Sequence, residues 1–154
     1  LVLNGALTGF SKNFGYGLRD IVIYWLLGQV TFVLGAFIYH KLKKYDVHEL
    51  IEYDDNIAVG FGFGAFLISL GVVVRASLVG AGLDAMTLEL PRTLLLALVG
   101  VMGVIAINAL ATLIITIGVK YEDEVEMHGN VAVSVVSAVA LISAAMLLAT
   151  IIQR

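Results

Sequence analysis

Four long apolar stretches without charged residues alternate with short polar segments along the chain. The stretches cover residues 21–39, 57–74, 93–119 and 131–153. The shortest rises about 27 Å as an α-helix, close to the roughly 30 Å hydrocarbon layer of a bilayer. None alternates apolar and polar positions as a transmembrane β-strand does. The pattern therefore predicts four transmembrane helices, at about residues 19–41, 55–76, 92–119 and 129–153.

Composition agrees with this pattern. Of the 154 residues, 60% are hydrophobic and 14% are charged, whereas soluble domains are about half apolar and about a quarter charged. We expect an all-α polytopic protein, a single membrane domain over residues 1–154 with the lipid bilayer as a partner. The net charge of −3 and the lack of a basic stripe exclude nucleic acid as a partner. Without cysteine, the chain has no CxxC redox motif and no thiolate metal ligands.

Residues 1–18 precede the first span and show a helical apolar spacing. Leu3, Leu7, Phe10 and Phe14 follow one another at intervals of three or four. This spacing predicts a short helix lying in the membrane interface. Further along, Pro91 is the only proline, and we expect it at or near the first turn of the third span, where proline is well tolerated.

A segment of sixteen residues occurs twice. Residues 56–71 recur as residues 130–145, with identical Asn, Ala, Val, Leu, Ile and Ser at six equivalent positions. Small residues at i, i+4 and i+11 let helices approach closely in lipid. The sequence therefore predicts that the second and fourth spans pack together through small residues, namely Gly60, Gly64 and Gly71 with Ser134, Ala138 and Ala145. Gly100 and Gly103 add a small face to the third span.

The polar segments before these two spans also match. Lys44-Tyr45-Asp46 resembles Lys120-Tyr121-Glu122, and acidic residues then lead to Asn56 in one segment and to Asn130 in the other. Both asparagines are expected to be helix N-caps. The predicted halves are residues 19–81 and 91–154. Because each half has two spans and returns to its starting side, the halves form a parallel repeat about an axis along the membrane normal.

The sequences Asp55-Asn56-Ile57-Ala58-Val59 and Gly129-Asn130-Val131-Ala132-Val133, with the four-span layout over about residues 19–152, resemble the YjfL-type family of small bacterial inner-membrane proteins. The resemblance implies two such halves in an inner membrane. That family has no established biochemical activity. Its members tend to be encoded near phage-shock-type envelope-stress proteins and peptide–amine ligases, which implies a role in the envelope. With the lysine cluster Lys41, Lys43 and Lys44 behind the first span, it favours cytoplasmic acidic segments and periplasmic termini.

The ionisable residues give little sign of catalysis, and we predict no enzyme and no cofactor. No carboxylate, histidine, lysine or arginine falls inside an apolar stretch, so no proton relay is expected in the membrane. His48 and His128 lie near acidic residues, but their spacing matches no metal motif. Asn108, Thr112 and Thr116 form a narrow polar stripe on the third span, which either packs against its own helix or lines a wet path.

Two functional hypotheses remain from the sequence. The favoured one is a non-enzymatic scaffold or interaction subunit of the bacterial envelope, assembled as a homo-oligomer or with an envelope protein. This hypothesis rests on the helix faces made of small residues, which pack helices together, and on the lack of ionisable side chains within the spans. The alternative is a small oligomeric channel or transporter. In that case the stripe of Asn108, Thr112 and Thr116 lines the path, and the acidic segments concentrate cations at its mouth.

Overall fold

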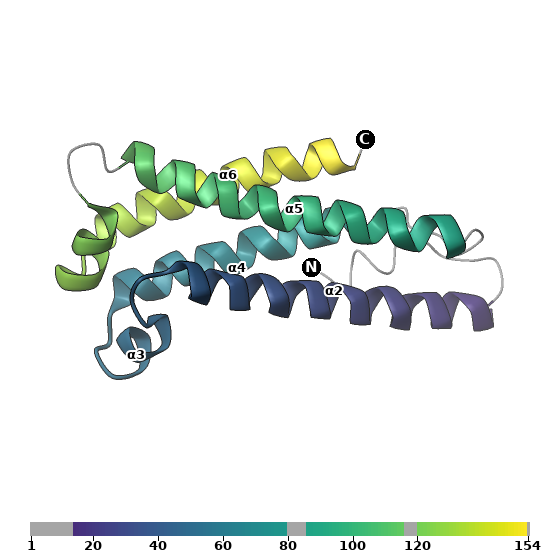
Figure 1. The fold of residues 1–154 in the computed structure, drawn as a ribbon, viewed down its shortest axis with the longest axis horizontal. Helices are drawn as coiled ribbons and strands as arrows, with labels where there is room; N and C mark the ends of the chain where they lie inside the picture. The colour runs from purple at the N-terminus through teal and green to yellow at the C-terminus, as the bar shows by residue number, and fades with distance from the viewer. Residues whose placement is uncertain (1–13, 80–85, 116–119, 154) are drawn as a thin grey trace.

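The computed structural model describes residues 14–79, 86–115 and 120–153, and these three ranges contain helices and no strand. The four long helices are α2 (Phe14–Leu42), α4 (Ile57–Leu78), α5 (Met86–Ile115) and α6 (Val131–Ile152) (Figure 1). Two short elements lie in the polar segments, the α-helix α3 (Val47–Glu52) and the π-helix η2 (Asp123–Met127).

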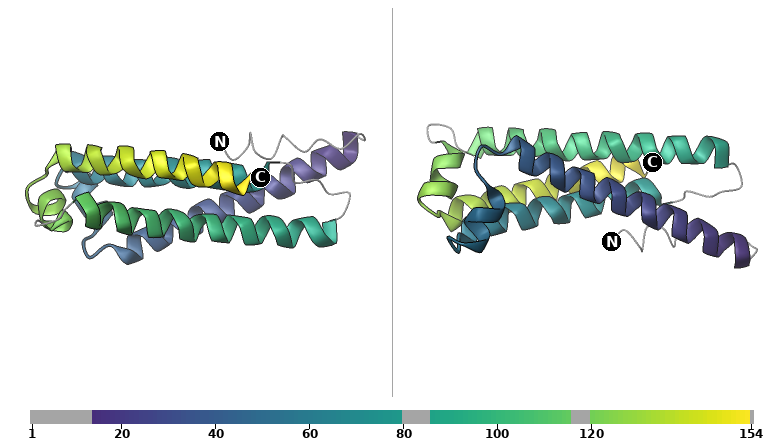
Figure 2. Two further views of the ribbon diagram at one scale, coloured as in Figure 1. Left: turned by 90° about the horizontal axis from the view of Figure 1, so that it is seen from above. Right: turned by 60° about the horizontal axis from the view of Figure 1, so that its bottom comes forward.

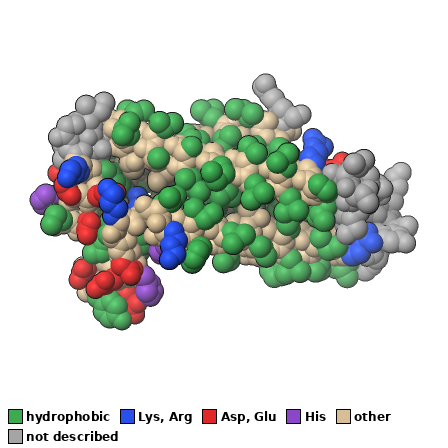
Figure 3. Space-filling view, in the orientation of Figure 1, with side chains coloured by type: hydrophobic (Ala, Val, Ile, Leu, Met, Phe, Trp, Pro, Cys, Tyr) green, Lys and Arg blue, Asp and Glu red, His purple; other side chains and the backbone are tan. Residues whose placement is uncertain are grey.

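Among the described residues, four helices are long and apolar enough to cross a membrane. Their apolar portions are Leu18–Leu42, Ile57–Leu78, Glu89–Ile114 and Val131–Ile152. Hydrophobic side chains cover the middle of the visible face, and charged side chains gather towards its ends (Figure 3). Such an arrangement matches the apolar interior and polar surfaces of a bilayer. The protein is an all-α multi-pass membrane protein, as the hydropathy pattern predicts.

Successive long helices run in opposite directions. The polar segments that contain α3 and η2 therefore lie at the same end of the molecule, opposite the end of α6 (Figure 1). We call this end the loop end. Helix α2 crosses the others obliquely, and its N-terminal part diverges from them (Figure 2).

Helix α4 is the central element. It contacts each of the other described helices, and its most extensive contact is with α6. Half of its apolar window is buried, whereas 22% is buried in α2 and α5 and 28% in α6. Phe66, Leu70, Val73 and Val74 are fully buried on α4, where they meet Leu141 of α6 in the core. The segment beginning at Asn56 is thus the one around which the bundle is built.

Two predicted boundaries differ from the structure. Helix α5 begins at Met86, earlier than the predicted residue 92, and contains Pro91 as its sixth residue, near its first turn. Glu89 in the first turn favours this earlier start through the helix dipole, and a proline there removes only one backbone hydrogen bond. At the other end α5 is described as far as Ile115. The last predicted residues of this span, 116–119, lie outside the described residues.

Only the last part of the predicted interfacial helix, residues 14–18, lies within the described residues. Residues 1–13 lie outside the described residues, while the helix that begins at Phe14 runs without interruption into the first span. The last five residues of the predicted interfacial segment, 14–18, are therefore part of α2. A continuous helix there is consistent with the apolar spacing, because no helix-breaking proline separates the two segments.

Candidate functional site

The two polar segments, distant in sequence, contact each other at the loop end. Lys44 Nζ lies 2.9 Å from Glu122 Oε2, in an exposed ion pair. Asn56 Nδ2 donates to the carbonyl oxygens of Val125, at 2.9 Å, and Glu126, at 3.2 Å. Val47 of the first segment and Val125 of the second are buried. These contacts fix the relative position of the first and second segments.

Asn56 and Asn130 are the N-caps of α4 and α6, which confirms the prediction for both. The Asn56 side chain accepts a hydrogen bond from the Val59 N–H at 3.1 Å, and that of Asn130 accepts one from Val133 at 3.3 Å. The residue before each cap has a positive φ, 49° at Asp55 and 57° at Gly129. Aspartate and glycine both tolerate this left-handed conformation better than most residues.

The two caps make equivalent backbone hydrogen bonds, but their side-chain amides donate to different partners. The backbone N–H of each asparagine donates to the carbonyl oxygen six residues earlier, that of Leu50 for Asn56 and that of Glu124 for Asn130, both at 2.9 Å. The side-chain amide of Asn130 donates to Glu124 Oε2 at 2.8 Å, within its own segment. Only the amide of Asn56, of these two, bonds across to the other segment.

A lysine close to three tyrosine rings lies directly after α2. Lys43 Nζ is 5.0 Å from the ring centroid of Tyr39, 5.2 Å from that of Tyr121 and 5.8 Å from that of Tyr45. We call these four residues the tyrosine–lysine cluster. The three rings are buried, and burial lowers the pKa of Lys43, although nearby Glu122 opposes that shift. Attraction between the ammonium group and the ring faces offsets part of the lost hydration.

Small and hydroxylated residues of α4 and α6 complete the surroundings of this cluster. A Cβ atom placed on Gly62 would lie 3.3 Å from Tyr121 Oη and 3.5 Å from Ser134 Oγ. Ser134 Oγ donates to the carbonyl oxygen of Ala58 on α4. Burial raises the pKa of Tyr121 and also that of Tyr45, so both remain protonated and able to donate. This polar interior was not predicted from the sequence.

Gly60 and Gly64 do not lie in the contact between α4 and α6. An added Cβ at either position would have nothing within 4 Å. Our prediction that these glycines pack against α6 of the same chain is therefore wrong. Gly71 is buried, as are Ser134, Ala138 and Ala145. The close approach uses the neighbouring Gly62 instead, since the helix turns about 100° per residue and turns Gly60 and Gly64 outwards.

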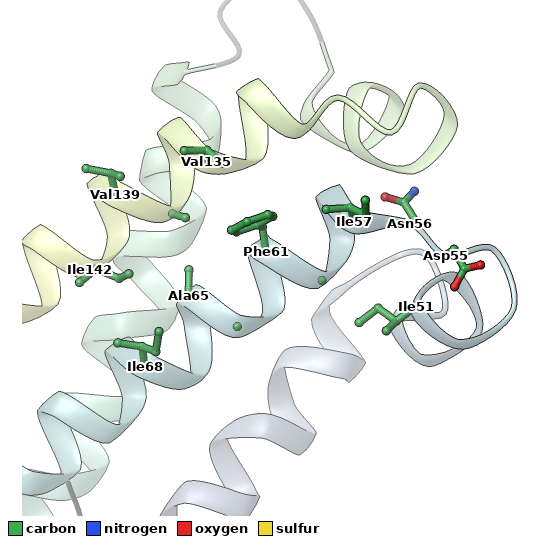
Figure 4. A pocket seen from close by; sticks show the side chains of 13 residues that line it. Ile51, Asp55, Asn56, Ile57, Phe61, Ala65, Ile68, Val135, Val139 and Ile142 are labelled. Atoms are coloured by element: carbon green, nitrogen blue, oxygen red, sulfur yellow. The ribbon is translucent and has the colours of Figure 1, made fainter.

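An apolar groove of about 640 Å³ covers the outward face of α4 beside α6. Gly60 and Gly64 line it, while Phe61 and Ile68, both about half exposed, also line it. Val135, Val139 and Ile142 of α6 line its other side, and Asp55 and Asn56 mark its end nearest the loops (Figure 4). We call it the glycine groove. It lies along membrane-spanning helices and is open to the surroundings.

The glycines of α5 do pack within the chain. An added Cβ at Gly100 would collide with Val73 of α4, and one at Gly103 would lie 2.6 Å from a methyl group of Leu148 on α6. A third close contact, not expected from the sequence, joins Gly35 of α2 to Leu70 of α4, at 2.7 Å from such a Cβ. Small residues thus allow close contacts of α2 and α5 with their neighbours.

The polar stripe on α5 is satisfied in part by its own helix. Thr112 Oγ1 donates to the carbonyl oxygens of Asn108, at 3.0 Å, and Ala109, at 2.9 Å. Asn108 and Thr112 are half-buried, and Thr116 lies outside the described residues. The bonds of Thr112 favour the packing interpretation of the stripe. A water-lined path stays an untested prediction.

The histidines pair separately with acidic residues. His48 Nε2 lies 2.9 Å from Glu52 Oε2, and His128 Nδ1 lies 3.8 Å from Glu124 Oε1, each pair on a single helical turn. Over the described ranges, no group of three or more histidine and acidic side chains converges as metal ligands do.

The fold and these surfaces define a multi-pass helical membrane protein with a polar interior at one end and an apolar groove on one face. The family model described as Domain of Unknown Function (DUF350) matches residues 12–152, and the chain belongs to this family. No curated protein and no solved structure gives a match to the chain. The family description names no activity.

Proposed function

We propose that the protein is a non-enzymatic membrane subunit that assembles with a second copy of itself through the glycine groove. The observation that carries the proposal is the open space at Gly60 and Gly64, where an added Cβ would meet nothing within 4 Å. In lipid, a pair of glycines four residues apart lets a second helix approach closely and gain van der Waals contact. A hollow of this kind on a membrane-spanning helix fits another helix.

A second copy is the partner that the groove fits best. The same face carries hollows at Gly60 and Gly64 and protruding side chains at Phe61 and Ile68. In a twofold contact each copy presents the same patch, so the protrusions of one copy meet the hollows of the other. The groove contains apolar side chains from both α4 and α6, which gives such a contact more area than a single helix provides.

Two further features belong to this proposal. First, the chain arose by duplication of a two-helix unit; the matching caps and positive φ angles at positions 55, 56, 129 and 130 support this. Second, the protein is an inner-membrane component of the bacterial envelope, with cytoplasmic loop end and periplasmic termini. Support for the orientation comes from the lysines beside the loop end. A homo-oligomer of this kind is a scaffold on which envelope proteins assemble.

The decisive experiment compares Gly64→Leu with Ala106→Leu. Both changes place a leucine side chain on the surface of a membrane-spanning helix, but Ala106 is exposed on α5 and does not line the groove. We expect wild type and Ala106→Leu to be dimers in lipid nanodiscs, and Gly64→Leu to dissociate at least about tenfold more readily, about 1.4 kcal/mol. Single-molecule subunit counting in lipid gives the stoichiometry, and circular dichroism checks that the helices remain.

The proposal fails if the wild type is monomeric in lipid over a wide range of protein-to-lipid ratios. It fails equally if Gly64→Leu leaves the dimer unchanged while its helical content is intact. Because the space around Gly64 is empty within the chain, the leucine should not disturb the fold of one copy. Loss of the dimer is then attributable to the groove.

A further inference from the structure

A second pocket, of about 410 Å³, lies at the loop end between α5 and the two polar segments. Three lysines line it: Lys43 and Lys44, which directly follow α2, and Lys120, at the start of the second polar segment. We call it the lysine pocket. Its lining residues are Lys43, Lys44, Lys120, Tyr121, Glu122, Thr112, Ala109 and Leu113.

The charges around the lysine pocket are unbalanced. The lining contains three lysines and one carboxylate, that of Glu122, which is already bonded to Lys44 at 2.9 Å, and Asp123 outside the lining also attracts Lys44. Neither Lys43 nor Lys120 forms an ion pair with any residue that the structure describes. Lys43 lies against the ring faces of the tyrosine–lysine cluster, and Glu122, the nearby carboxylate, is already paired with Lys44. A partly buried ammonium group without a counter-ion is stabilised by an anion.

The position of the pocket relative to the membrane identifies the anion further. The apolar portions of α2 and α5 end at Leu42 and Ile114, next to the pocket-lining residues Lys43 and Leu113. Lys43 and Leu113 are therefore near the boundary between hydrocarbon and headgroups. Leu113, 71% exposed, and Ala109 supply an apolar wall on the membrane side, while the lysines lie on the loop side.

We propose that the lysine pocket binds the phosphoryl group of an anionic phospholipid. Lys43 and Lys120 supply the uncompensated positive charge, and the acyl chains lie along Ala109 and Leu113 on the membrane side. Basic pockets beside transmembrane helices bind lipid headgroups in this way. This inference is independent of the glycine groove, because the two sites share no lining residue.

The test measures lipid binding by native mass spectrometry of the full chain in a neutral detergent. Phosphatidylglycerol, which is anionic, is compared with phosphatidylcholine, which is zwitterionic, at equal concentration. We expect clear preference for phosphatidylglycerol, and Lys120→Gln should weaken that binding about fivefold, as for the loss of one cation near an anionic membrane surface. Lys43→Gln should weaken it at least as much.

Lys41→Gln is the matched control. Lys41 lies at the same end of α2 and is exposed, but its ammonium group lies 5.6 Å from the Phe37 ring centroid and does not line the pocket. The control should retain wild-type lipid binding. An equal loss in Lys41→Gln and Lys120→Gln would show general attraction to surface charge and would overturn the proposal. Lys120 is exposed, so its variant remains informative even if Lys43→Gln fails to fold.

Inorganic phosphate distinguishes the two sources of a phosphoryl group. If excess phosphate displaces phosphatidylglycerol from wild type, the lipid headgroup occupies the pocket as proposed. If phosphate binds in a Lys120-dependent manner but the two lipids bind equally, the pocket takes a soluble phosphoryl group and the lipid assignment is wrong. Equal binding of both lipids with no effect of phosphate removes the site altogether.

Discussion

Asn56 has two structural roles at once. Its side-chain oxygen caps α4, and its amide donates to two backbone carbonyls of the second polar segment. Losing a cap costs about 1 kcal/mol, and leaving a part-buried carbonyl without its donor adds a comparable cost. We expect Asn56→Ala to lower the free energy of unfolding by about 2 kcal/mol. Unfolding in mixed micelles of increasing dodecyl sulfate content, followed by circular dichroism, measures this change.

Asn56→Ser separates the two roles. Serine caps a helix as well as asparagine does, but its hydroxyl is too short to replace the amide across the segments. Its stability should therefore fall between wild type and Asn56→Ala. If Ser and Ala are equally destabilised, the cap contributes nothing, and if both equal wild type, neither bond matters.

Residue type alone predicted the two caps, because an asparagine after an acidic segment and before an apolar run has few other local roles. The tyrosine–lysine cluster was not predictable in the same way. Lys43 and Tyr121 are more than seventy positions apart, and the first looks like an ordinary stop to a membrane span. The only signal in the sequence was the repeated Lys-Tyr pair, at positions 44–45 and 120–121. That repeat does not indicate that the tyrosine rings of both pairs pack around Lys43.

At the scale of helices, a glycine has opposite meanings according to the face it occupies. Gly100 of α5 lies against Val73 of α4, whereas Gly64 of α4 faces open space. Valine is stiff, so it cannot yield easily to a new methyl group. Gly100→Ala should therefore destabilise the bundle by about 1–3 kcal/mol. The same change at Gly64 should be neutral or stabilising by up to about 1 kcal/mol, because alanine favours helix.

The same micelle unfolding experiment measures both alanine variants, in detergent at a dilution where only monomer is present. A similar loss of stability in Gly100→Ala and Gly64→Ala would contradict the packing described for α5 against α4. Gly103→Ala is a useful intermediate, since its close neighbour is the end of the flexible Leu148 side chain.

Hydropathy predicted the four spans because burial in lipid requires long uncharged runs, and the observed helices begin and end close to those runs. It did not predict which face of α4 meets α6. Helix α4 is apolar on every side, so periodicity gives no direction. The stripe of small residues suggested one face, and the structure uses Gly62 and Ala58 instead. Only the contacts of a folded bundle distinguish two small-residue faces on one helix.

At the scale of the whole molecule, polar and apolar functions are separated along the bundle axis. The lysine pocket and the tyrosine–lysine cluster lie at the loop end, where the two polar segments meet. The glycine groove extends from that end along the membrane-spanning part of α4. A lipid headgroup in one site and a second copy in the other can therefore be bound together without overlap. Both sites depend on the two polar segments being on the same side of the membrane.

That dependence gives the last prediction, which uses the absence of cysteine from the chain. Single cysteines at Asp54 and Glu126 would be exposed in the two polar segments, and one at Arg92 would be exposed near the opposite end, at the start of α5. Because an even number of spans separates positions 54 and 126, a membrane-impermeant maleimide should label both from the same face of sealed vesicles. The cysteine at position 92 should react only from the other face. Labelling of positions 54 and 126 from opposite faces would exclude the four-span arrangement and both sites with it.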